Sequence, residues 1–195
     1  MKKVGIVNYG VGNYQSVYHA IMLAGSEPFD ISCRSDFSNL DAIILPGVGH
    51  YDVAFNALRS QELDKHIQDL SGSNIPIIGI CLGFHLMGSG SEEALDSKGL
   101  NIFKQKVKKN PHTKVNTGWR LVKNCLTNKK EKYYFNHGYN FEVSDHTIMS
   151  CKMHNTNTKF SAFSTRENFY GLQFHLEKSG VPGINLLEKI IQCEF

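Results

Sequence analysis

Residues 74–83 read Asn-Ile-Pro-Ile-Ile-Gly-Ile-Cys-Leu-Gly, and their β-branched run is typical of a buried strand in a parallel sheet. The run ends in Gly79-Ile80-Cys81-Leu82-Gly83, which has the spacing of the nucleophile elbow G-x-S-x-G with cysteine in place of serine. Glycine on each side of a sharp strand-to-helix turn lets neighbouring backbone approach without a Cβ clash. A helix that begins at Leu82 would favour a thiolate and offer N–H groups to an oxyanion. The stretch therefore predicts that Cys81 is a nucleophile rather than a structural cysteine.

The composition bounds the classes of protein to consider. A chain of 195 residues is long enough for one α/β domain over residues 1–195, and no linker-like segment divides it. The net charge of +3 is too small to indicate nucleic-acid binding, so the lysines at 104–109 and 129–132 are expected to lie on solvated faces of hairpins. No apolar stretch approaches the ~18 residues that span a membrane. Five scattered cysteines without metal-ligand spacing predict no metal site and favour a reducing, cytoplasmic location.

The first hundred residues alternate between strand and helix patterns. Repeated βα units imply a mainly parallel sheet with right-handed crossovers, whose ligands bind at the carboxyl ends of the strands. Cys81 and the loop Gly47-Val48-Gly49 should therefore lie at the same edge. The expected strands are Val4–Asn8, Phe29–Cys33 and Asp41–Leu45. The first expected helix is capped by Asn13 and ended by Gly25, and its buried side carries Tyr14, Val17, Ile21 and Ala24. Two further helices are expected at Val53–Leu58 and Leu63–Leu70.

After Gly99 the pattern changes to short strands separated by turns, which predicts a largely antiparallel set that extends or flanks the parallel sheet. Pro182 is expected to be the first residue of a last helix. The expected strands are Trp119–Val122, Tyr133–Asn136, Thr147–Met149, Phe160–Phe163 and Phe169–Phe174, and the last helix should bury Ile184, Leu187, Ile190 and Ile191.

A cysteine nucleophile needs a base, usually histidine, and a third group that orients the imidazole. Two of the nine histidines have an acid two residues later, His50 with Asp52 and His175 with Glu177. Asp52 is expected to cap the helix that begins near Val53. His175 closes an apolar strand, and residues i and i+2 of a strand share a face. Cys81, His175 and Glu177 are therefore predicted to act as a triad, the alternative being that His175 is an ordinary histidine at a strand end.

The motifs around these residues resemble those of the class I (triad) glutamine amidotransferase family, and within it the glutaminase subunits of imidazole glycerol phosphate synthase. The similarity spans the whole chain and keeps the order of the motifs. It rests on the elbow and on the segments 5–13 (GIVNYGVGN), 45–49 (LPGVG), 91–93 (SEE), 118–119 (GW), 134–139 (YFNHGY) and 170–179 (YGLQFHLEKS).

This resemblance implies a flavodoxin-like three-layer α/β fold and a glutaminase that needs no cofactor. By similarity, Cys81 attacks the side-chain amide of glutamine, and His175, oriented by Glu177, moves protons. The oxyanion hole would use the N–H of Leu82 and a peptide of the Gly47-Val48-Gly49 loop. The resemblance also implies a partner, a cyclase with a TIM-barrel fold through which the released ammonia travels, and a glutaminase that is nearly idle until this partner docks.

The resemblance assigns further residues by position. Those at the substrate site would be Gly49, Gly83, His85, Glu93, His137, Gly138 and Tyr139. Asn13, Trp119 and Lys178 match positions at or near the subunit interface, although Trp119 could equally be an ordinary packing residue. Three residues depart from the family pattern, His85 for glutamine, Gly138 for serine and Leu176 for proline. If His85 contacts the substrate, His85→Gln should lower the KM for glutamine.

These departures keep other functions open. A related subunit could supply ammonia for amidino groups on bacterial surface sugars, and the substrate of the complex would distinguish the two pathways. A binding or regulatory module with an inactive site has only His85 and Leu176 in its favour. A cysteine peptidase would cleave peptides without a partner, and the motifs outside the triad argue against it.

Overall fold

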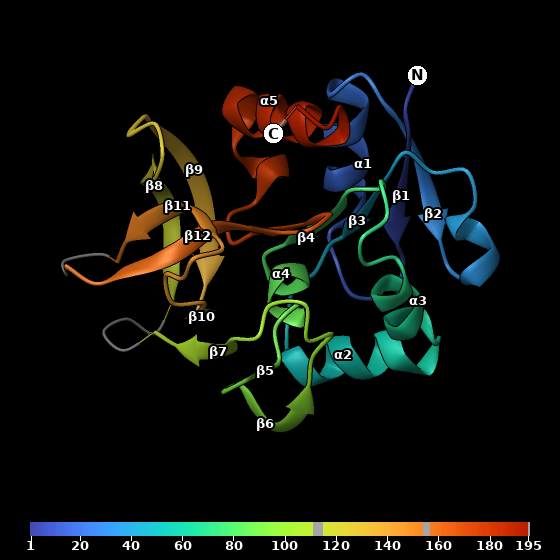
Figure 1. Ribbon diagram of the computed structural model, residues 1–195, viewed down its shortest axis with the longest axis horizontal. Coiled ribbons are helices and arrows are strands. Elements are labelled where there is room, and N and C mark those ends of the chain that lie inside the picture. Colours follow the sequence, from blue (N-terminus) through green and yellow to red (C-terminus); the bar gives the residue numbers. More distant parts are fainter. Residues whose placement is uncertain (111–114, 154–156, 195) are drawn as a thin grey trace.

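The computed structural model describes residues 1–110, 115–153 and 157–194. Its backbone is built on one nine-stranded sheet and one four-stranded sheet, with helices on both faces of the larger sheet (Figure 1). The elements in chain order are β1 (Lys3–Val7), α1 (Tyr14–Leu23), β2 (Glu27–Ile31), η1 (Arg34–Phe37), β3 (Ala42–Leu45), α2 (Tyr51–Ser60), α3 (Leu63–Asp69), β4 (Ile77–Ile80), α4 (Leu82–Leu86), β5 (Gly90–Ser91), β6 (Ala94–Lys98), β7 (Lys106–Lys109), β8 (Asn116–Asn124), β9 (Lys130–His137), β10 (Tyr139–Asn140), β11 (Thr147–Lys152), β12 (Lys159–Arg166), β13 (Phe169–Leu172), η2 (Leu176–Lys178) and α5 (Gly180–Ile191).

The larger sheet has the strand order β2-β1-β3-β4-β13-β12-β11-β8-β9. Its first five strands are parallel, and every residue of β3 and β4 is buried, as their apolar runs predict. The predicted α/β class, with a mainly parallel sheet and an added antiparallel set, is confirmed.

The direction of β13 differs from the sequence-based expectation. The segment from Phe169 was placed among the antiparallel strands, but β13 pairs parallel with β4 and antiparallel with β12. A two-residue turn, with Glu167 at a positive φ of 53°, joins β12 to β13 and sets their antiparallel pairing. β13 is thus the strand at which the sheet changes direction, and its carboxyl end lies beside that of β4.

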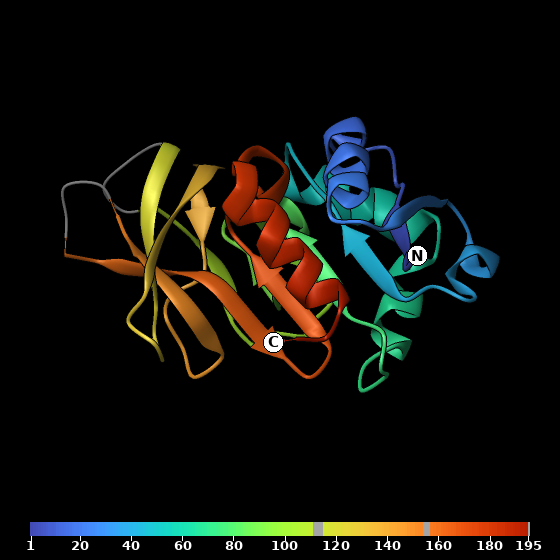
Figure 2. The same cartoon turned by 90° about the horizontal axis from the view of Figure 1, so that it is seen from above.

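Two hydrophobic clusters cover the two faces of the parallel strands. One face carries α1 and α5, which contribute Val17, Ile21 and Leu187. The other carries α2, α3 and α4, which contribute Leu58, Ile67 and Phe84. Figures 1 and 2 show α5 and α1 on one side of the sheet and α2 and α3 on the other. This is the predicted three-layer arrangement.

The four-stranded sheet, of order β10-β7-β5-β6, was not predicted. Two of its strands are only two residues long, which is too short for an apolar alternation to show in the sequence. The lysine-rich segment 104–109 was predicted to be a solvated hairpin face, and β7 keeps its lysines at the surface while Val107 is fully buried.

Three element boundaries correct the expectations. β2 begins at Glu27, two residues before the predicted start. α2 begins at Tyr51 with His50 as its N-cap, so Asp52 lies in the first turn and does not cap the helix. α5 begins at Gly180, which makes Pro182 its third residue; proline is tolerated there because the first turn needs no N–H. α1 does begin after Asn13, but the Asn13 side chain makes no capping hydrogen bond.

Candidate active site

The turn from β4 to α4 holds Cys81 in a strained conformation. Its φ of 53° and ψ of −105° lie in a sparsely populated region, which costs of order 1–3 kcal/mol. The backbone N–H of Cys81 donates to the carbonyl of Leu172 at 2.7 Å, which ties the elbow to β13. A Cβ on Gly83 would lie 1.8 Å from the carbonyl oxygen of Leu45, and one on Gly79 would lie 2.8 Å from the N atom of Phe84. Both glycines of the motif are therefore required by close backbone approach.

His175 and Glu177 are in direct contact. The Nδ1 atom of His175 lies 2.7 Å from Oε1 of Glu177, and both side chains are nearly inaccessible to solvent. The pairing was predicted from strand alternation, but β13 ends at Leu172 and His175 is the N-cap residue of the 3-10 turn η2. The turn, rather than a strand, brings the carboxylate to the imidazole.

The other ring nitrogen of His175 faces Cys81. Among the described residues its Nε2 atom has no hydrogen-bond partner, although it is buried. Burial by itself would lower the pKa of His175, but the nearby Cys81 side chain and the Glu177 carboxylate outweigh it and raise this pKa to about 10. The Cys81 thiol is positioned to donate to the carbonyl of Asn136 at 3.7 Å. The site therefore places a histidine that favours its protonated form beside the sulfur of a candidate nucleophile.

A pocket of about 140 Å³ opens at the carboxyl ends of β4 and β13. The predicted common edge is confirmed, because Val48 and Gly49 line this pocket together with Cys81. Of the predicted residues, Gly47, Gly83, Glu177, Asn13 and Trp119 are not among its lining residues. Those that line it are Val48, Gly49, Cys81, Leu82, His85, Glu93, His137, Gly138, Tyr139, His175 and Lys178, joined by Asn136.

The loop after β3 is fixed by a hydrogen bond from Tyr9. The hydroxyl of Tyr9 donates to the carbonyl of Pro46 at 2.5 Å. A Cβ on Gly47 would lie 2.8 Å from this hydroxyl and 2.9 Å from the N atom of Gly83, so the loop packs directly against the first turn of α4. Gly49 has a φ of +99°, a conformation that favours glycine. Tyr9 thereby fixes the part of the loop that leads to the predicted oxyanion hole.

Two neutral imidazoles form one wall of the pocket. His85 lies with its Nε2 atom 2.8 Å from Oε1 of Gln173, and burial lowers its pKa to about 4. His137 contacts the carbonyl of Tyr139 through Nδ1 and the Asn116 amide through Nε2, and burial lowers its pKa to about 3. His85 therefore already has a protein partner, and the predicted contact of His85 with the substrate stays a prediction.

Glu93 supplies a carboxylate at the rim of the pocket. It accepts a hydrogen bond from the backbone N–H of Tyr51 at 3.2 Å, and its Oε1 lies 4.0 Å from Nε2 of His50. Partial burial raises the pKa of Glu93. A carboxylate placed there could accept a hydrogen bond from the ammonium group of an amino acid in the pocket.

Three supporting residues were missed by the sequence-based reasoning. The carbonyl of Asn136 faces the thiol, Gln173 binds His85, and the Ser179 hydroxyl donates to the carbonyl of His175 while it accepts from the N–H of Tyr134. All three lie inside the segments 134–139 and 170–179 that were singled out, so their positions carried a signal. The role of Gln173 depends on the pairing of β13 with β4, which no local pattern reveals.

The three residues assigned to a partner interface lie at the surface. Trp119 is 50% exposed and packs edge-on against Tyr134 at a centroid distance of 6.1 Å. Asn13 and Lys178 are also exposed.

The described residues hold neither a cluster of metal ligands nor a membrane-spanning helix. Over 1–110, 115–153 and 157–194, no group of three or more His, Cys, Asp or Glu side chains is arranged to hold a metal ion. Within the same ranges, no helix is both long enough and apolar enough to cross a membrane.

Comparison with known proteins gives consistent matches over nearly the full chain. The imidazole glycerol phosphate synthase subunit HisH of Methanopyrus kandleri is 35% identical, with 97% of each chain covered. The subunit of the same name from Staphylococcus saprophyticus is 32% identical, covering 98% of this chain and 95% of its own. Among solved structures, a glutamine amidotransferase superposes with a TM-score of 0.78 at 13% identity over 96% of this chain and 97% of that one, which shows a shared fold.

The sequence profile of glutamine amidotransferase class-I matches residues 6–192. This match includes the elbow, the His175–Glu177 pair and the loop after β3. The chain therefore belongs to the class-I glutamine amidotransferase family.

Proposed function

We propose that this enzyme is the glutaminase subunit of an imidazole glycerol phosphate synthase and that it supplies ammonia for histidine biosynthesis. The observation that carries the proposal is the contact between Glu177 and His175, at 2.7 Å, with the free nitrogen of the imidazole directed at Cys81. The names of the relatives that match at 31–35% identity support the pathway.

The proposed chemistry begins with attack of the Cys81 thiolate on the side-chain carbonyl carbon of glutamine. The C–N bond breaks as Nε2 of His175 gives its proton to the leaving nitrogen, which departs as ammonia. A water molecule, deprotonated by His175, then hydrolyses the γ-glutamyl thioester and releases glutamate and the thiol. Glu177 stabilises the imidazolium form of His175 in both half-reactions.

Charge develops on the carbonyl oxygen of glutamine in both steps. Leu82 is the residue after the nucleophile, and in other elbow enzymes the backbone N–H at this position is one donor of the oxyanion hole. We assign the same role to the N–H of Leu82, and we assign the other donor to the Gly47-Val48-Gly49 loop. Loss of one donor typically costs about 10²–10³ in rate, so the conformation of this loop could set the activity.

The partner in this proposal is a synthase subunit with a TIM-barrel fold. It would dock over the mouth of the pocket, where Asn13, Trp119 and Lys178 are exposed, and would receive the ammonia. We also propose a cytoplasmic location, which the five free cysteines support.

The test is release of glutamate from glutamine with and without the barrel subunit. We expect slow turnover by the chain alone, strong stimulation in the complex, and none for Cys81→Ala. Cys125→Ala, which removes an exposed thiol, serves as the matched control and should behave as wild type. Activity that survives Cys81→Ala would disprove the assignment of the nucleophile.

The substrate of the complex decides the pathway. Two departures from the family pattern, His85 and Gly138, line the pocket, and this favours keeping the amidino-sugar pathway as a second candidate. Turnover of a phosphoribosyl substrate by the complex supports histidine biosynthesis. Turnover of a free or nucleotide-linked sugar instead would assign the second function.

A further inference from the structure

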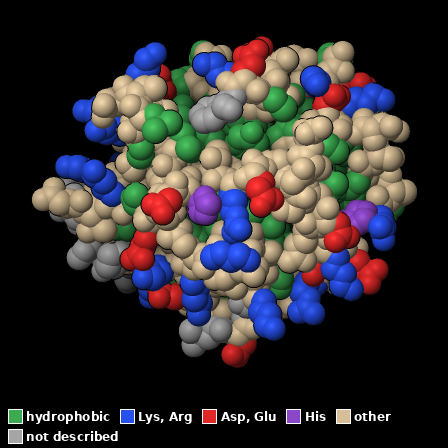
Figure 3. Space-filling model, in the orientation of Figure 1, with side chains coloured by type: hydrophobic (Ala, Val, Ile, Leu, Met, Phe, Trp, Pro, Cys, Tyr) green, Lys and Arg blue, Asp and Glu red, His purple; other side chains and the backbone are tan. Residues whose placement is uncertain are grey.

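The outer face of the antiparallel strands carries a group of lysines. Lys123 of β8 lies opposite Lys130 of β9, and Lys152 of β11 lies opposite Lys159 of β12. Lys132 lies on the same face, because it is two residues from Lys130 along β9. We call Lys123, Lys130, Lys132, Lys152 and Lys159 the lysine face. In Figure 3, several lysine and arginine side chains lie at the left end of the molecule, where these strands are, and others lie along its lower edge.

Four of these lysines border a single groove. The groove encloses about 500 Å³, and its other lining residues are Arg120, Leu121, Ser150 and Cys151. All five charged side chains that line it are therefore basic. A concave surface of one charge sign attracts an anionic ligand more strongly than a flat surface does.

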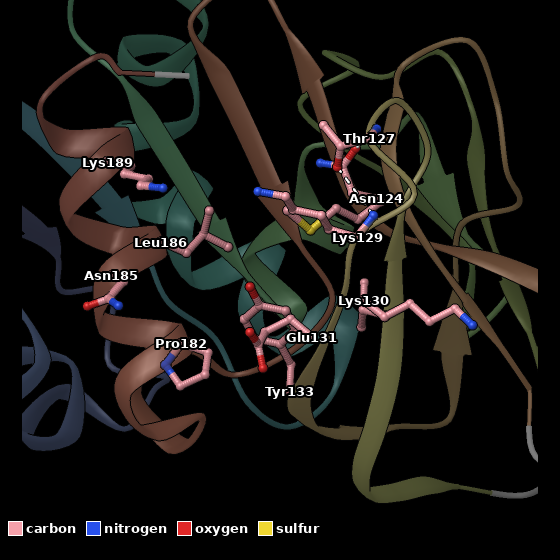
Figure 4. Close-up of a pocket in the computed structure, with 12 residues that line it drawn as sticks. Asn124, Thr127, Lys129, Lys130, Glu131, Tyr133, Pro182, Asn185, Leu186 and Lys189 are labelled. Atoms are coloured by element: carbon pink, nitrogen blue, oxygen red, sulfur yellow. Dashed lines mark hydrogen bonds between the residues drawn. The ribbon is translucent and has the colours of Figure 1, made fainter.

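The positive charges of the lysine face are not neutralised within the described residues. None of the five lysines forms an ion pair there. The basic residues that do form ion pairs are Lys2, His50, Arg59, Lys65, Lys108 and His175. Glu131 lies between Lys130 and Lys132 in sequence, but Figure 4 shows that it points toward α5, whereas Lys130 points away from that helix. Residues 111–114 and 154–156 contain no aspartate or glutamate.

Like charges on directly opposed strand positions weaken the pairing of strands. Lys123 with Lys130 and Lys152 with Lys159 are two such pairs, so the fold gains nothing from them. A bound anionic group would replace this repulsion by attraction.

Neighbouring residues point to a protein rather than a nucleic acid as this partner. Leu121 and Trp119 lie on β8 on the same face as Lys123, and each is about half exposed. An apolar surface bordered by charges is typical of protein interfaces. The guanidinium of Arg120, the residue type best suited to phosphates, is held by the carbonyls of Thr117 and Trp119 and by the Asn116 side chain.

We propose that the lysine face binds an acidic surface segment of the partner subunit, beside the contact made by Trp119. This inference rests on the proposed function, which supplies the partner. The charges steer and hold the docked subunit and take no part in the glutaminase chemistry.

The test compares two triple variants of the full chain. Lys123→Gln/Lys152→Gln/Lys159→Gln removes three charges from the lysine face. Lys98→Gln/Lys104→Gln/Lys189→Gln removes three exposed charges elsewhere and is the matched control. Association with the barrel subunit is measured by surface plasmon resonance at about 50 mM and about 300 mM NaCl, together with glutaminase activity at saturating subunit.

We expect the first triple variant to lose at least about tenfold in association rate constant at low salt, with a flatter salt dependence, and the control to stay close to wild type. Both variants should reach wild-type glutaminase activity once saturated with the subunit. If wild type binds and is stimulated but the two triple variants associate equally fast, the lysine face is not a docking surface and the proposed function stands.

Two other results would also overturn the inference. If wild type neither binds the subunit nor is stimulated by it, the proposed function fails and the docking surface with it. If the lysine-face variant loses affinity only for a single-stranded oligothymidylate while its association with the subunit is unchanged, the surface binds nucleic acid instead.

Discussion

Glu177 fixes the direction in which His175 can move a proton. Its carboxylate accepts the Nδ1 hydrogen at 2.7 Å, which leaves Nε2 as the nitrogen that faces Cys81. The negative charge also favours the imidazolium form, and it contributes to the raised pKa of His175. The carboxylate thus both orients the imidazole and stabilises its charge.

The substitution Glu177→Gln keeps the shape of this side chain and removes its charge. In the complex with the partner subunit, we expect kcat to fall by about 10²–10⁴ with little change in KM, because the imidazolium loses its stabilising charge while the pocket keeps its shape. Steady-state release of glutamate measures both constants. Glu188→Gln, on the exposed side of α5, is the control, and equal kcat values for the two variants would refute the role of Glu177.

His85 couples the stability of the pocket wall to pH. Burial holds its folded-state pKa at about 4, below the ordinary value of 6.5, so the neutral form is favoured by folding. The corresponding stability is fully present above pH 6.5 and is lost as the pH falls from 6.5 through about 4. His137 acts in the same direction, because burial lowers its pKa as well.

The variant His85→Gln should therefore lose less stability in acid than wild type does. Urea unfolding at pH 7 and at about pH 4.5 gives the free energy of unfolding at each pH. The difference between the two values should be smaller for His85→Gln, whereas His19→Gln, at an exposed position of α1, should match wild type. An unchanged pH dependence would show that His85 is not held neutral by the fold.

Each triad residue could be predicted from the sequence, but the hydrogen-bond partners of the neighbouring histidines could not. Cys81 was found from the spacing of two glycines, and the acid two residues after His175 singled out that histidine. His85 is hydrogen-bonded to Gln173, and His137 is hydrogen-bonded to Asn116. Each partner is far from its histidine in the sequence, so no local pattern connects them.

At the level of elements, the turn between β4 and α4 is the feature that places the nucleophile. Its glycines are set by backbone packing, since a Cβ on Gly83 would overlap the carbonyl of Leu45 at the end of β3. The elbow, the end of β3 and the loop before α2 therefore form one rigid unit. The positive φ of Cys81 is maintained by this packing.

The substitution Gly83→Ala should disrupt that unit. We expect the free energy of unfolding to fall by at least about 2 kcal/mol, because α4 or β3 must shift to accept the added methyl group. Urea unfolding monitored by circular dichroism measures the change. Gln15→Ala on the exposed side of α1 is the control, and a Gly83→Ala protein as stable as that control would contradict the packing.

The strand positions were largely predictable, but the direction of β13 was not. The apolar runs predicted the positions of β1, β3 and β4, with ends that differ from the observed ones by only a few residues. The parallel pairing of β13 with β4 depends on contacts between residues about 90 positions apart, which a single sequence does not reveal. Yet this pairing, more than strand alternation, is what brings His175 to Cys81.

At the level of the whole molecule, the site lies at the junction of the parallel and antiparallel parts of the sheet. β4 supplies the nucleophile, β13 leads to the base, and β9 ends at the wall formed by Asn136 and His137. We propose that residues 1–195 form one domain, because Ala94 and Val107 of the smaller sheet belong to the same hydrophobic cluster as Val7 of β1. The pocket is thus lined by residues of both sheets and of α4.

Covalent labelling with the glutamine analogue 6-diazo-5-oxo-L-norleucine tests the identity of the nucleophile most directly. The chain contains five free cysteines, of which Cys33, Cys125 and Cys193 are exposed and Cys151 is buried, so the other four serve as internal controls. After incubation with the barrel subunit present, peptide mass spectrometry should find a single adduct, on Cys81, which excess glutamine prevents. An adduct on another cysteine with Cys81 unmodified, or no adduct at all in the active complex, would contradict the account.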